Sequence, residues 1–292
     1  LMSVFIDKKT KVICQGMTGV QASFHIQRSL NYGTKIVGGV TPGKGGTLHL
    51  GLPVFDTMKE AVAETGGTAS IMYVPAKAVK SAVREAIDAG LKLAVCIADS
   101  VPLKDMLEIK EMLRESEMRF VGPNTPGIIT PKEAHLGVFP ENILKQGRIG
   151  IVSRSSTLTY EAILETNRAG LGESTVVGLG DDILMGVDFV EVLKAFHEDK
   201  KTDAVVMLGH LGGAFEEAAA SWYKKLEHKK PVVAFVAGDA VPFGHRMGYA
   251  GDVLTNGYVS VQDKKDALAE AGIIVVNHIN DIHTKLAELA LK

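Results

Sequence analysis

The sequence predicts an α/β protein with two parallel-sheet halves, and three observations support this fold class. Apolar β-branched runs alternate with amphipathic segments along the 292 residues. Strands of a parallel sheet are apolar without alternation because helices cover both faces, and these runs have that character. A stretch with three prolines and two glycines, GPNTPGIITP at residues 122–131, then separates one βα series from another.

In the first half of the chain, the sequence predicts five strands with helices between them. The expected strands are Lys11–Cys14, Lys35–Val40, Ala69–Val74, Lys92–Ile97 and Arg119–Val121. Among the intervening segments, Val79–Ala89 and Met106–Ser116 repeat apolar residues at spacings of three and four, which gives each one buried helical face. The first half is therefore predicted to be a βαβ series.

The second half repeats this organisation. Its expected strands are Arg148–Val152, Thr175–Val177, Ala204–Leu208, Pro231–Val236 and Ile273–Val276. Helices are expected between them, one of them beginning near Ala214. We place the domain boundary at the Pro-rich stretch, which gives a first domain at 1–125, a connection at 126–146 and a second domain at 147–292.

Composition excludes several classes of protein. With 46% hydrophobic and 23% charged residues, the chain is expected to be soluble and globular. Lys and Arg (32) nearly balance Asp and Glu (34), so nothing indicates a nucleic-acid partner. No apolar run reaches the roughly 18 residues of a membrane span, and the start, LMSVFIDKKTK, lacks the order of a signal peptide. We expect a cytoplasmic protein with buried thiols at Cys14 and Cys96 and, since its histidines show no ligand spacing, no metal.

Glycine-rich loops follow the first two predicted strands. Gln15–Gln21 forms a Gly-x-x-Gly turn that opens a helix, and residues 38–46 contain five glycines around Lys44. Loops at the carboxyl ends of neighbouring parallel strands share one sheet edge, where free N–H groups bind phosphates. Asp99, after the fourth strand, can accept hydrogen bonds from a ribose or adenine. The alternatives are glycines that only permit tight turns and a solvated loop acid.

In the second half, hydroxyl residues and a histidine stand at strand ends. The run Val152–Tyr160 contains Ser155, Ser156 and Thr157 where a strand passes into a helix, which suits a phosphoryl or carboxylate group. Simple N-capping explains the same residues equally well. His210 lies between glycines in GHLGG, where it is either structural or functional.

Several long runs resemble the α subunit of succinate–CoA ligase over essentially the whole chain. They are VICQGMTGVQ, YGTKIVGGVTPGKGGTLHLGLPVFDT, GPNTPGIITP, GIVSRSSTLTYE and PVVAFVAG, in the order and spacing of that family. The resemblance implies a Rossmann-like CoA-binding domain followed by a flavodoxin-like ligase domain. It also implies a β subunit that carries the site for ATP or GTP with Mg²⁺.

The resemblance assigns residues to both ligand sites. Coenzyme A would contact Thr18, Gly19, Val20, Gln21, Lys44, Ile97, Ala98 and Asp99, the last of these shorter than the family's usual glutamate. Tyr160 would lie near a small carboxylate substrate. Ser155, Ser156 and Thr157 would form one of two helix N-termini that face the active-site phosphate, and the β subunit would supply the other.

Two positions depart from the family pattern where the phosphoryl group is carried. The family passes it through a histidine in the string Arg-Met-Gly-His-Ala-Gly, whereas here Tyr249 stands at that position. A phenol is a poor substitute for an imidazole as phosphoryl carrier. The family's Gly-Glu-Ile-Gly-Gly string has become GHLGG, which places His210 where a supporting glutamate stood. His210 is therefore a candidate replacement carrier, with Tyr249 orienting it.

These departures leave three functions open. The leading hypothesis is a ligase α subunit that acts with its β partner on succinate or a related carboxylate. The alternative is a CoA-binding or regulatory homologue without phosphoryl transfer, as the loss of the family histidine suggests. A redox dehydrogenase is a third possibility, for which the sequence offers no catalytic constellation.

Overall fold

A computed structural model describes residues 4–241, 260–289 and 291. The chain divides into two compact units. The N-terminal unit contains residues 5–139 and 184–187, and the C-terminal unit contains Val4 and the described parts of residues 140–183 and 188–292. The domain limits expected from the sequence, at residues 125 and 147, stay a prediction.

The N-terminal unit is built on a sheet with the strand order β3-β4-β2-β1-β5-β6-β7. The strands β1, β2, β5, β6 and β7 confirm the five predicted runs to within two residues at each end, and β3–β4 is an additional antiparallel hairpin. The bounds are Val12–Gln15 (β1), Ile36–Val40 (β2), Leu48–His49 (β3), Leu52–Phe55 (β4), Ala69–Met72 (β5), Leu93–Cys96 (β6) and Arg119–Val121 (β7).

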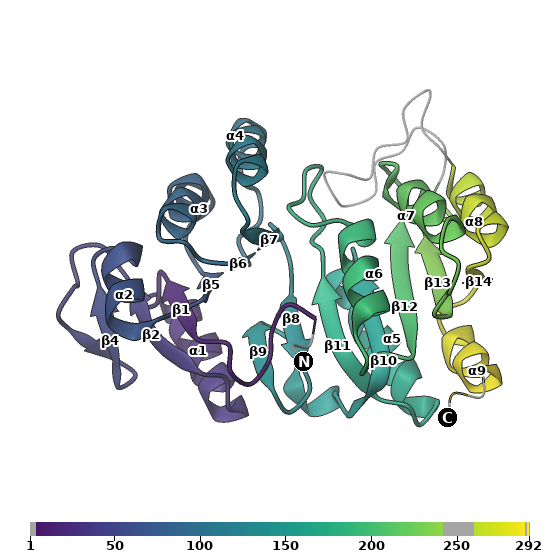
Figure 1. The fold of residues 1–292 in the computed structure, drawn as a ribbon, viewed down its shortest axis with the longest axis horizontal. Coiled ribbons are helices and arrows are strands. Elements are labelled where there is room, and N and C mark those ends of the chain that lie inside the picture. The colour runs from purple at the N-terminus through teal and green to yellow at the C-terminus, as the bar shows by residue number, and fades with distance from the viewer. Residues whose placement is uncertain (1–3, 242–259, 290, 292) are drawn as a thin grey trace. The chain divides into compact units, whose positions relative to one another are not determined.

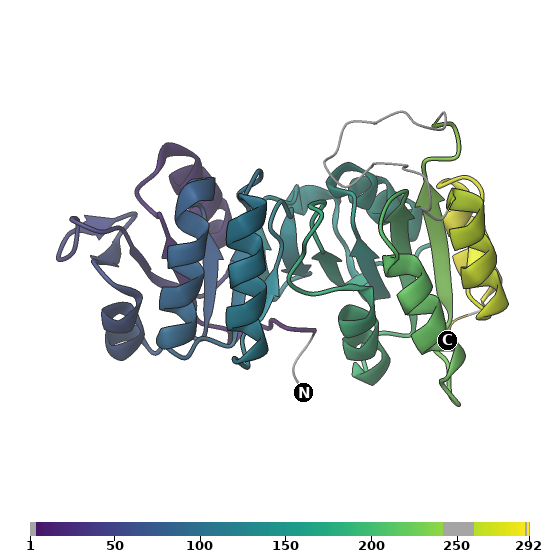
Figure 2. The same cartoon turned by 90° about the horizontal axis from the view of Figure 1, so that it is seen from above.

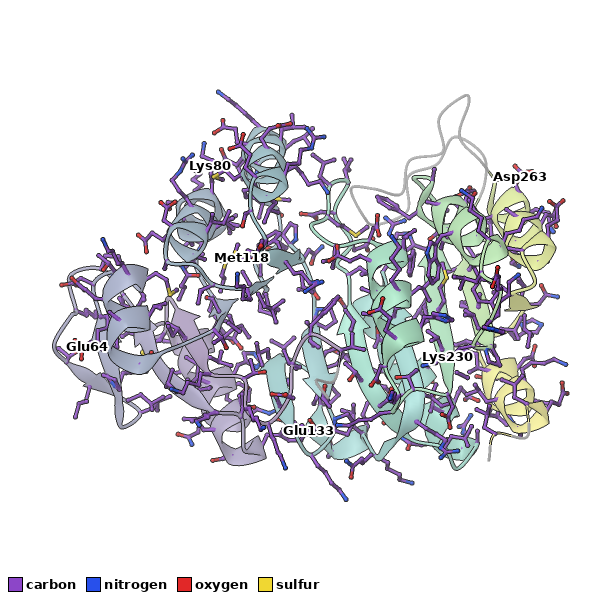
Figure 3. All side chains as sticks on the ribbon, in the orientation of Figure 1. Glu64, Lys80, Met118, Glu133, Lys230 and Asp263 are labelled. Carbon is purple, nitrogen blue, oxygen red and sulfur yellow. The ribbon has the colours of Figure 1, made fainter. Side chains whose placement is uncertain are left out.

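Helices cover both faces of this sheet, as a parallel sheet requires. Figure 1 shows α2, α3 and α4 on one face and α1 on the other. The bounds are Val20–Tyr32 (α1), Met58–Thr65 (α2), Val79–Asp88 (α3) and Leu103–Arg114 (α4). Figure 2 shows α3 and α4 side by side, and Lys80 of α3, labelled in Figure 3, forms ion pairs with Asp105 (2.8 Å) and Glu108 (3.0 Å) of α4.

Residues 122–131 are more than the connection that their prolines and glycines suggested. The strand β8, Gly127–Thr130, lies within them and pairs antiparallel with β9, Ala134–Gly137. Ile128 and Ile129 are fully buried. A side chain on Gly127 would overlap the carbonyl oxygen of Leu136 across the hairpin. The glycine therefore permits a close approach of two strands, whereas we had interpreted it as a break.

The C-terminal unit contains parallel strands in the order β14-β13-β12-β10-β11. All five predicted strands are confirmed, with β12 extending to His210. Helix α5 packs with α9, and α7 packs with both α6 and α8. The strand bounds are Gln146–Ser153 (β10), Glu173–Gly178 (β11), Ala204–His210 (β12), Val232–Ala237 (β13) and Ile274–Val276 (β14), and the helix bounds are Ser156–Arg168 (α5), Phe189–Glu198 (α6), Phe215–Lys224 (α7), Val261–Glu270 (α8) and Asp281–Glu288 (α9).

Within the described parts of the chain, no helix combines the length and apolarity needed to cross a membrane.

Candidate functional site

The two glycine loops of the N-terminal unit lie at one edge of its sheet. Strands β1 and β2 are parallel neighbours, with Gln15 opposite Val40 at their carboxyl ends. The backbone N–H of Gly16 donates to the carbonyl of Val40 (2.8 Å), which fixes the start of the first loop against the end of β2. This edge is where ligands bind in open parallel sheets.

Side chains join the two loops. The ammonium group of Lys44 donates to Oγ1 of Thr18 (3.1 Å), and the hydroxyl of Thr18 lies 3.4 Å from that of Thr41. Lys44 is exposed, so its charge also faces solvent. We call this group of Thr18, Thr41 and Lys44 the phosphate corner, because a cation and two hydroxyls beside free backbone N–H groups suit a phosphate.

Asp56 holds the second loop in shape. Its Oδ1 accepts hydrogen bonds from the N–H groups of Gly43 (2.7 Å) and Gly45 (2.9 Å). A Cβ on Gly45 would lie 2.5 Å from Oδ2 of Asp56, so a larger residue would force the Asp56 carboxylate to shift. Asp56 was not among the predicted site residues, although the run GLPVFDT shows an acid directly after β4.

Helix α1 begins beside the phosphate corner with its N-terminus uncapped. Gly19 is the N-cap residue and offers no side-chain cap, whereas Thr57 caps α2 through a complete capping box. Gly19, Val20 and Gln21 are exposed. The positive end of the α1 dipole and its first N–H groups are thus open to an anionic ligand.

The third predicted contact segment follows β6. Ile97 and Ala98 are half-buried and Asp99 is exposed. The carbonyl of Ala98 accepts a hydrogen bond from the N–H of Asn124 (2.8 Å). Because β5 alone separates β6 from β1, this segment lies along the same sheet edge, roughly 10 Å from the first loop.

In the C-terminal unit, the predicted hydroxyl residues lie at the start of α5. Ser155 is buried and is the N-cap residue, since its hydroxyl accepts a hydrogen bond from the N–H of Leu158 (3.3 Å). The hydroxyls of Ser155 and Thr157 lie 3.5 Å apart. Ser156 is half-buried, Thr157 is exposed, and half-buried Tyr160 follows one turn later. N-capping therefore accounts for Ser155.

His210 is the last residue of β12 and is 5% exposed. Its Nδ1 lies 2.8 Å from the carbonyl oxygen of Leu211, and its Nε2 lies 2.6 Å from Oδ1 of Asp181. The Asp181 contact lacks hydrogen-bond geometry, so it is an ion pair when the ring is protonated. The backbone N–H of His210 donates to Oε1 of Glu216 (3.2 Å).

Further charged side chains surround this histidine. The guanidinium group of Arg154, which is 1% exposed, donates to the carbonyl of Gly212 (3.1 Å) and lies 4.8 Å from the ring centre of Phe215. It also lies 3.9 Å from the carboxylates of Asp181 and Glu216.

Glu216 has a second cationic partner in Lys264 of α8. The two fully buried side chains meet at 2.6 Å, and Lys264 also contacts Glu217 (3.1 Å) and the carbonyl of Gly213 (2.8 Å). Buried charges persist only when paired in this way. We call this group the buried charge cluster; its members are Arg154, Asp181, His210, Glu216, Glu217 and Lys264.

Only His210 of the buried charge cluster was a candidate from the sequence. Glu216 and Glu217 lie in the first turn of α7, and both also pair with Lys264. Tyr249, the other carrier candidate, lies outside the described residues. Among the residues that are described, no group of three or more His, Cys, Asp or Glu side chains is arranged to hold a metal ion.

Among known proteins, one family model matches each half of the chain, and two relatives match nearly all of it. Residues 7–100 match the model of the CoA binding domain family, and residues 152–274 match that of the CoA-ligase family. The succinate–CoA ligase [ADP-forming] subunit alpha 2 of Archaeoglobus fulgidus is 48% identical over 99% of this chain and 100% of its own length. The corresponding alpha subunit of Staphylococcus aureus is 47% identical over 99% of this chain and 95% of its own.

Solved structures share the fold at lower identity. ATP citrate lyase of Methanosaeta concilii, in complex with (3S)-citryl-CoA, superposes with a TM-score of 0.90 at 23% identity over 99% of this chain. This chain spans about half of that lyase, 51% of its length. A dinucleotide-forming acetyl-coenzyme A synthetase of Ca. Korarchaeum cryptofilum superposes with a TM-score of 0.75 at 18% identity over 94% of this chain and 59% of its own.

Proposed function

Because the chain belongs to the succinate–CoA ligase alpha-subunit family, we propose that it binds coenzyme A and acts in a nucleotide-dependent acid–CoA ligase. Its substrate is succinate or a related small carboxylate. A β subunit completes the enzyme and supplies the site for ATP or GTP with Mg²⁺. The near balance of charges and the two buried cysteines suit a cytoplasmic setting without nucleic-acid or membrane partners.

Coenzyme A binds at the sheet edge of the N-terminal unit. The observation that supports this most is the 3.1 Å contact between Lys44 and Thr18, which unites the two glycine loops beside the uncapped start of α1. The phosphates of the coenzyme lie in this corner and its nucleoside part extends toward the segment after β6. The proposed contacts are Thr18, Gly19, Val20, Gln21, Lys44, Ile97, Ala98 and Asp99.

Calorimetry with coenzyme A tests this assignment. Removing the cation with Lys44→Met should weaken binding about 10- to 100-fold, since a hydrogen bond to a charged group contributes about 1.5–3 kcal/mol. Lys59→Met is the matched control, because Lys59 is also exposed but lies on α2. Equal affinities for the Lys44 and Lys59 variants would contradict the assignment.

The second proposed site is in the C-terminal unit. Ser155, Ser156 and Thr157 present the start of α5 to a phosphoryl or carboxylate group, and Tyr160 contacts the carboxylate substrate. The positive end of the helix dipole supports this role. The hydroxyl of exposed Thr157 is available to a ligand at its surface, while Ser155 holds the helix start.

We further propose His210 as the phosphoryl carrier, with Tyr249 orienting it. A carbonyl oxygen only accepts hydrogen bonds, so the 2.8 Å contact with Leu211 requires the proton on Nδ1. That tautomer leaves the nucleophilic lone pair on Nε2. The contact between Nε2 and Asp181 must open before phosphorus reaches this nitrogen.

Phosphate labelling tests the carrier. The chain is combined with its β subunit, Mg²⁺ and γ-labelled nucleotide, and the labelled residue is identified by mass spectrometry. We expect an acid-labile label that His210→Asn abolishes and that the control His197→Asn, on α6, leaves unchanged. A label that survives His210→Asn, or an acid-stable label on Tyr249, would exclude His210 as carrier.

A further inference from the structure

The ring of His210 has an oxygen partner on each nitrogen, and the two partners differ in chemistry. Leu211 offers a carbonyl at 2.8 Å from Nδ1, whereas Asp181 offers a carboxylate at 2.6 Å from Nε2. A carbonyl holds a proton in place, while a carboxylate can also take one up. The two ring nitrogens are therefore held by groups of different function.

We propose that Asp181 is a positioning residue for His210, holding the ring through Nε2 and receiving its proton when this nitrogen becomes the phosphoryl acceptor. The inference rests on the proposed function of His210 as carrier. Nothing in the sequence suggested the pair, because Asp181 follows β11 and His210 ends β12, strands that β10 separates in the sheet.

Burial strengthens the attraction between the Asp181 carboxylate and the His210 ring. Asp181 is 3% exposed and His210 is 5% exposed, so little water weakens their attraction. Neither carboxylate oxygen of Asp181 accepts a hydrogen bond from any described residue. Its partners are charges, namely His210 at 2.6 Å and Arg154 at 3.9 Å. A buried carboxylate with so few partners is stabilised most by a protonated imidazole.

The charge balance of the buried charge cluster also favours a proton on His210. Arg154 and Lys264 supply two positive charges against the three carboxylates of Asp181, Glu216 and Glu217. A proton on His210 makes the cluster neutral. Among the described residues, Asp181, in the loop after β11, faces the ring, Glu216 of α7 accepts a hydrogen bond from the backbone N–H of His210, and Arg154, directly after β10, lies near both carboxylates.

Phosphoryl transfer to His210 requires that Nε2 first lose its proton. When the His210 ring is protonated, it carries one proton on each nitrogen. The proton on Nε2 passes to Asp181, and the freed lone pair attacks the γ-phosphorus of a nucleoside triphosphate. The N–P bond forms as the P–O bond breaks, and the nucleoside diphosphate leaves with the electron pair of that bond. The other proton stays on Nδ1 throughout and remains hydrogen-bonded to the carbonyl of Leu211.

Asp181 and the incoming phosphoryl group thus compete for one nitrogen, and pH decides the competition. Labelling of the wild-type complex should rise with pH as the ring loses its Nε2 proton. Asp181→Asn removes the charge that holds this proton. The pH at which labelling of this variant is half-maximal should therefore be lower than in wild type by about one unit or more. Asp182→Asn, a change at the half-buried neighbouring acid, is the matched control and should keep the wild-type profile.

A second readout does not depend on catalysis. The ¹⁵N resonances of the His210 ring, followed against pH in the complete chain, should show Nδ1–H at high pH and a titration that Asp181→Asn moves downward. Identical ring titrations in wild type and Asp181→Asn would overturn the inference. Asp181→Ala serves in the same way if the asparagine variant does not fold.

The two proposals fail differently. If His210 is not the carrier, no form of the protein carries a label on it, yet the ring titration still reports on Asp181. If His210 carries the label and Asp181→Asn leaves both the labelling profile and the ring titration unchanged, the positioning role of Asp181 is wrong.

Discussion

Replacing Glu173 with glutamine should change how the stability of the C-terminal unit depends on pH. Glu173 starts β11 and is fully buried, and its Oε2 accepts a hydrogen bond from the N–H of Lys145 (2.9 Å). Burial raises the pKa of its carboxyl from 4.5 to about 8, against the smaller lowering by hydrogen bonds. The glutamine keeps an oxygen for Lys145 and cannot ionise.

The sign and size of the effect follow from proton linkage. Between pH 4.5 and about 8 the folded protein binds one proton at Glu173 that the unfolded chain has lost, so the free energy of unfolding falls as pH rises. Each pH unit is worth about 1.4 kcal/mol, so a range of roughly 3.5 units gives a loss of order 5 kcal/mol. Glu173→Gln removes this loss, and its stability relative to wild type should improve by that order across the range.

Urea unfolding at a series of pH values measures this difference. Trp222, the single tryptophan, lies on α7 and reports on the same unit by fluorescence. Other titrating groups cancel when variant and wild type are compared. Glu64→Gln, at an exposed position on α2, is the control and should follow wild type at every pH. A difference between Glu173→Gln and wild type that stays constant from pH 4.5 to 8.5 would refute the reasoning.

Two further predictions concern the proposed sites. Lys264→Met leaves the carboxylate of Glu216 buried without its 2.6 Å partner, so unfolding should become easier by about 3–5 kcal/mol, and the double variant Lys264→Met/Glu216→Gln should recover much of that loss in urea titrations. An unchanged midpoint in the single variant would show that the pair does not stabilise the fold. Gly45→Ala forces a Cβ against Asp56, so the affinity for coenzyme A should fall about tenfold in calorimetry while the melting temperature stays near that of wild type. An unaltered affinity would mean that this loop does not bind the coenzyme.

The sequence predicted the elements whose pattern is local. The runs at β1, β2, β10 and β12 are continuous and apolar because parallel strands are buried on both faces. Their order along the chain also placed the two glycine loops at one edge. Strand β8 was not predicted because its Gly127 permits a close approach of two backbones. A single sequence does not distinguish such a glycine from one that forms a turn.

The parts that escaped prediction depend on contacts between distant segments. Glu216 and Lys264 are 48 residues apart on two helices, and a charged residue on a helix is normally placed on the solvent side. Only the packing of α7 against α8 buries both. The pair of Asp181 and His210 likewise requires the order of strands in the sheet, which periodicity does not give.

The most direct test of the account is a crystal structure of the chain with coenzyme A. We expect the phosphates of the coenzyme within hydrogen-bond distance of the Lys44 ammonium group and of the first N–H groups of α1, with the nucleoside part along the segment from Ile97 to Asp99. Coenzyme bound at another surface, with the phosphate corner empty at saturating concentration, would contradict the central claim.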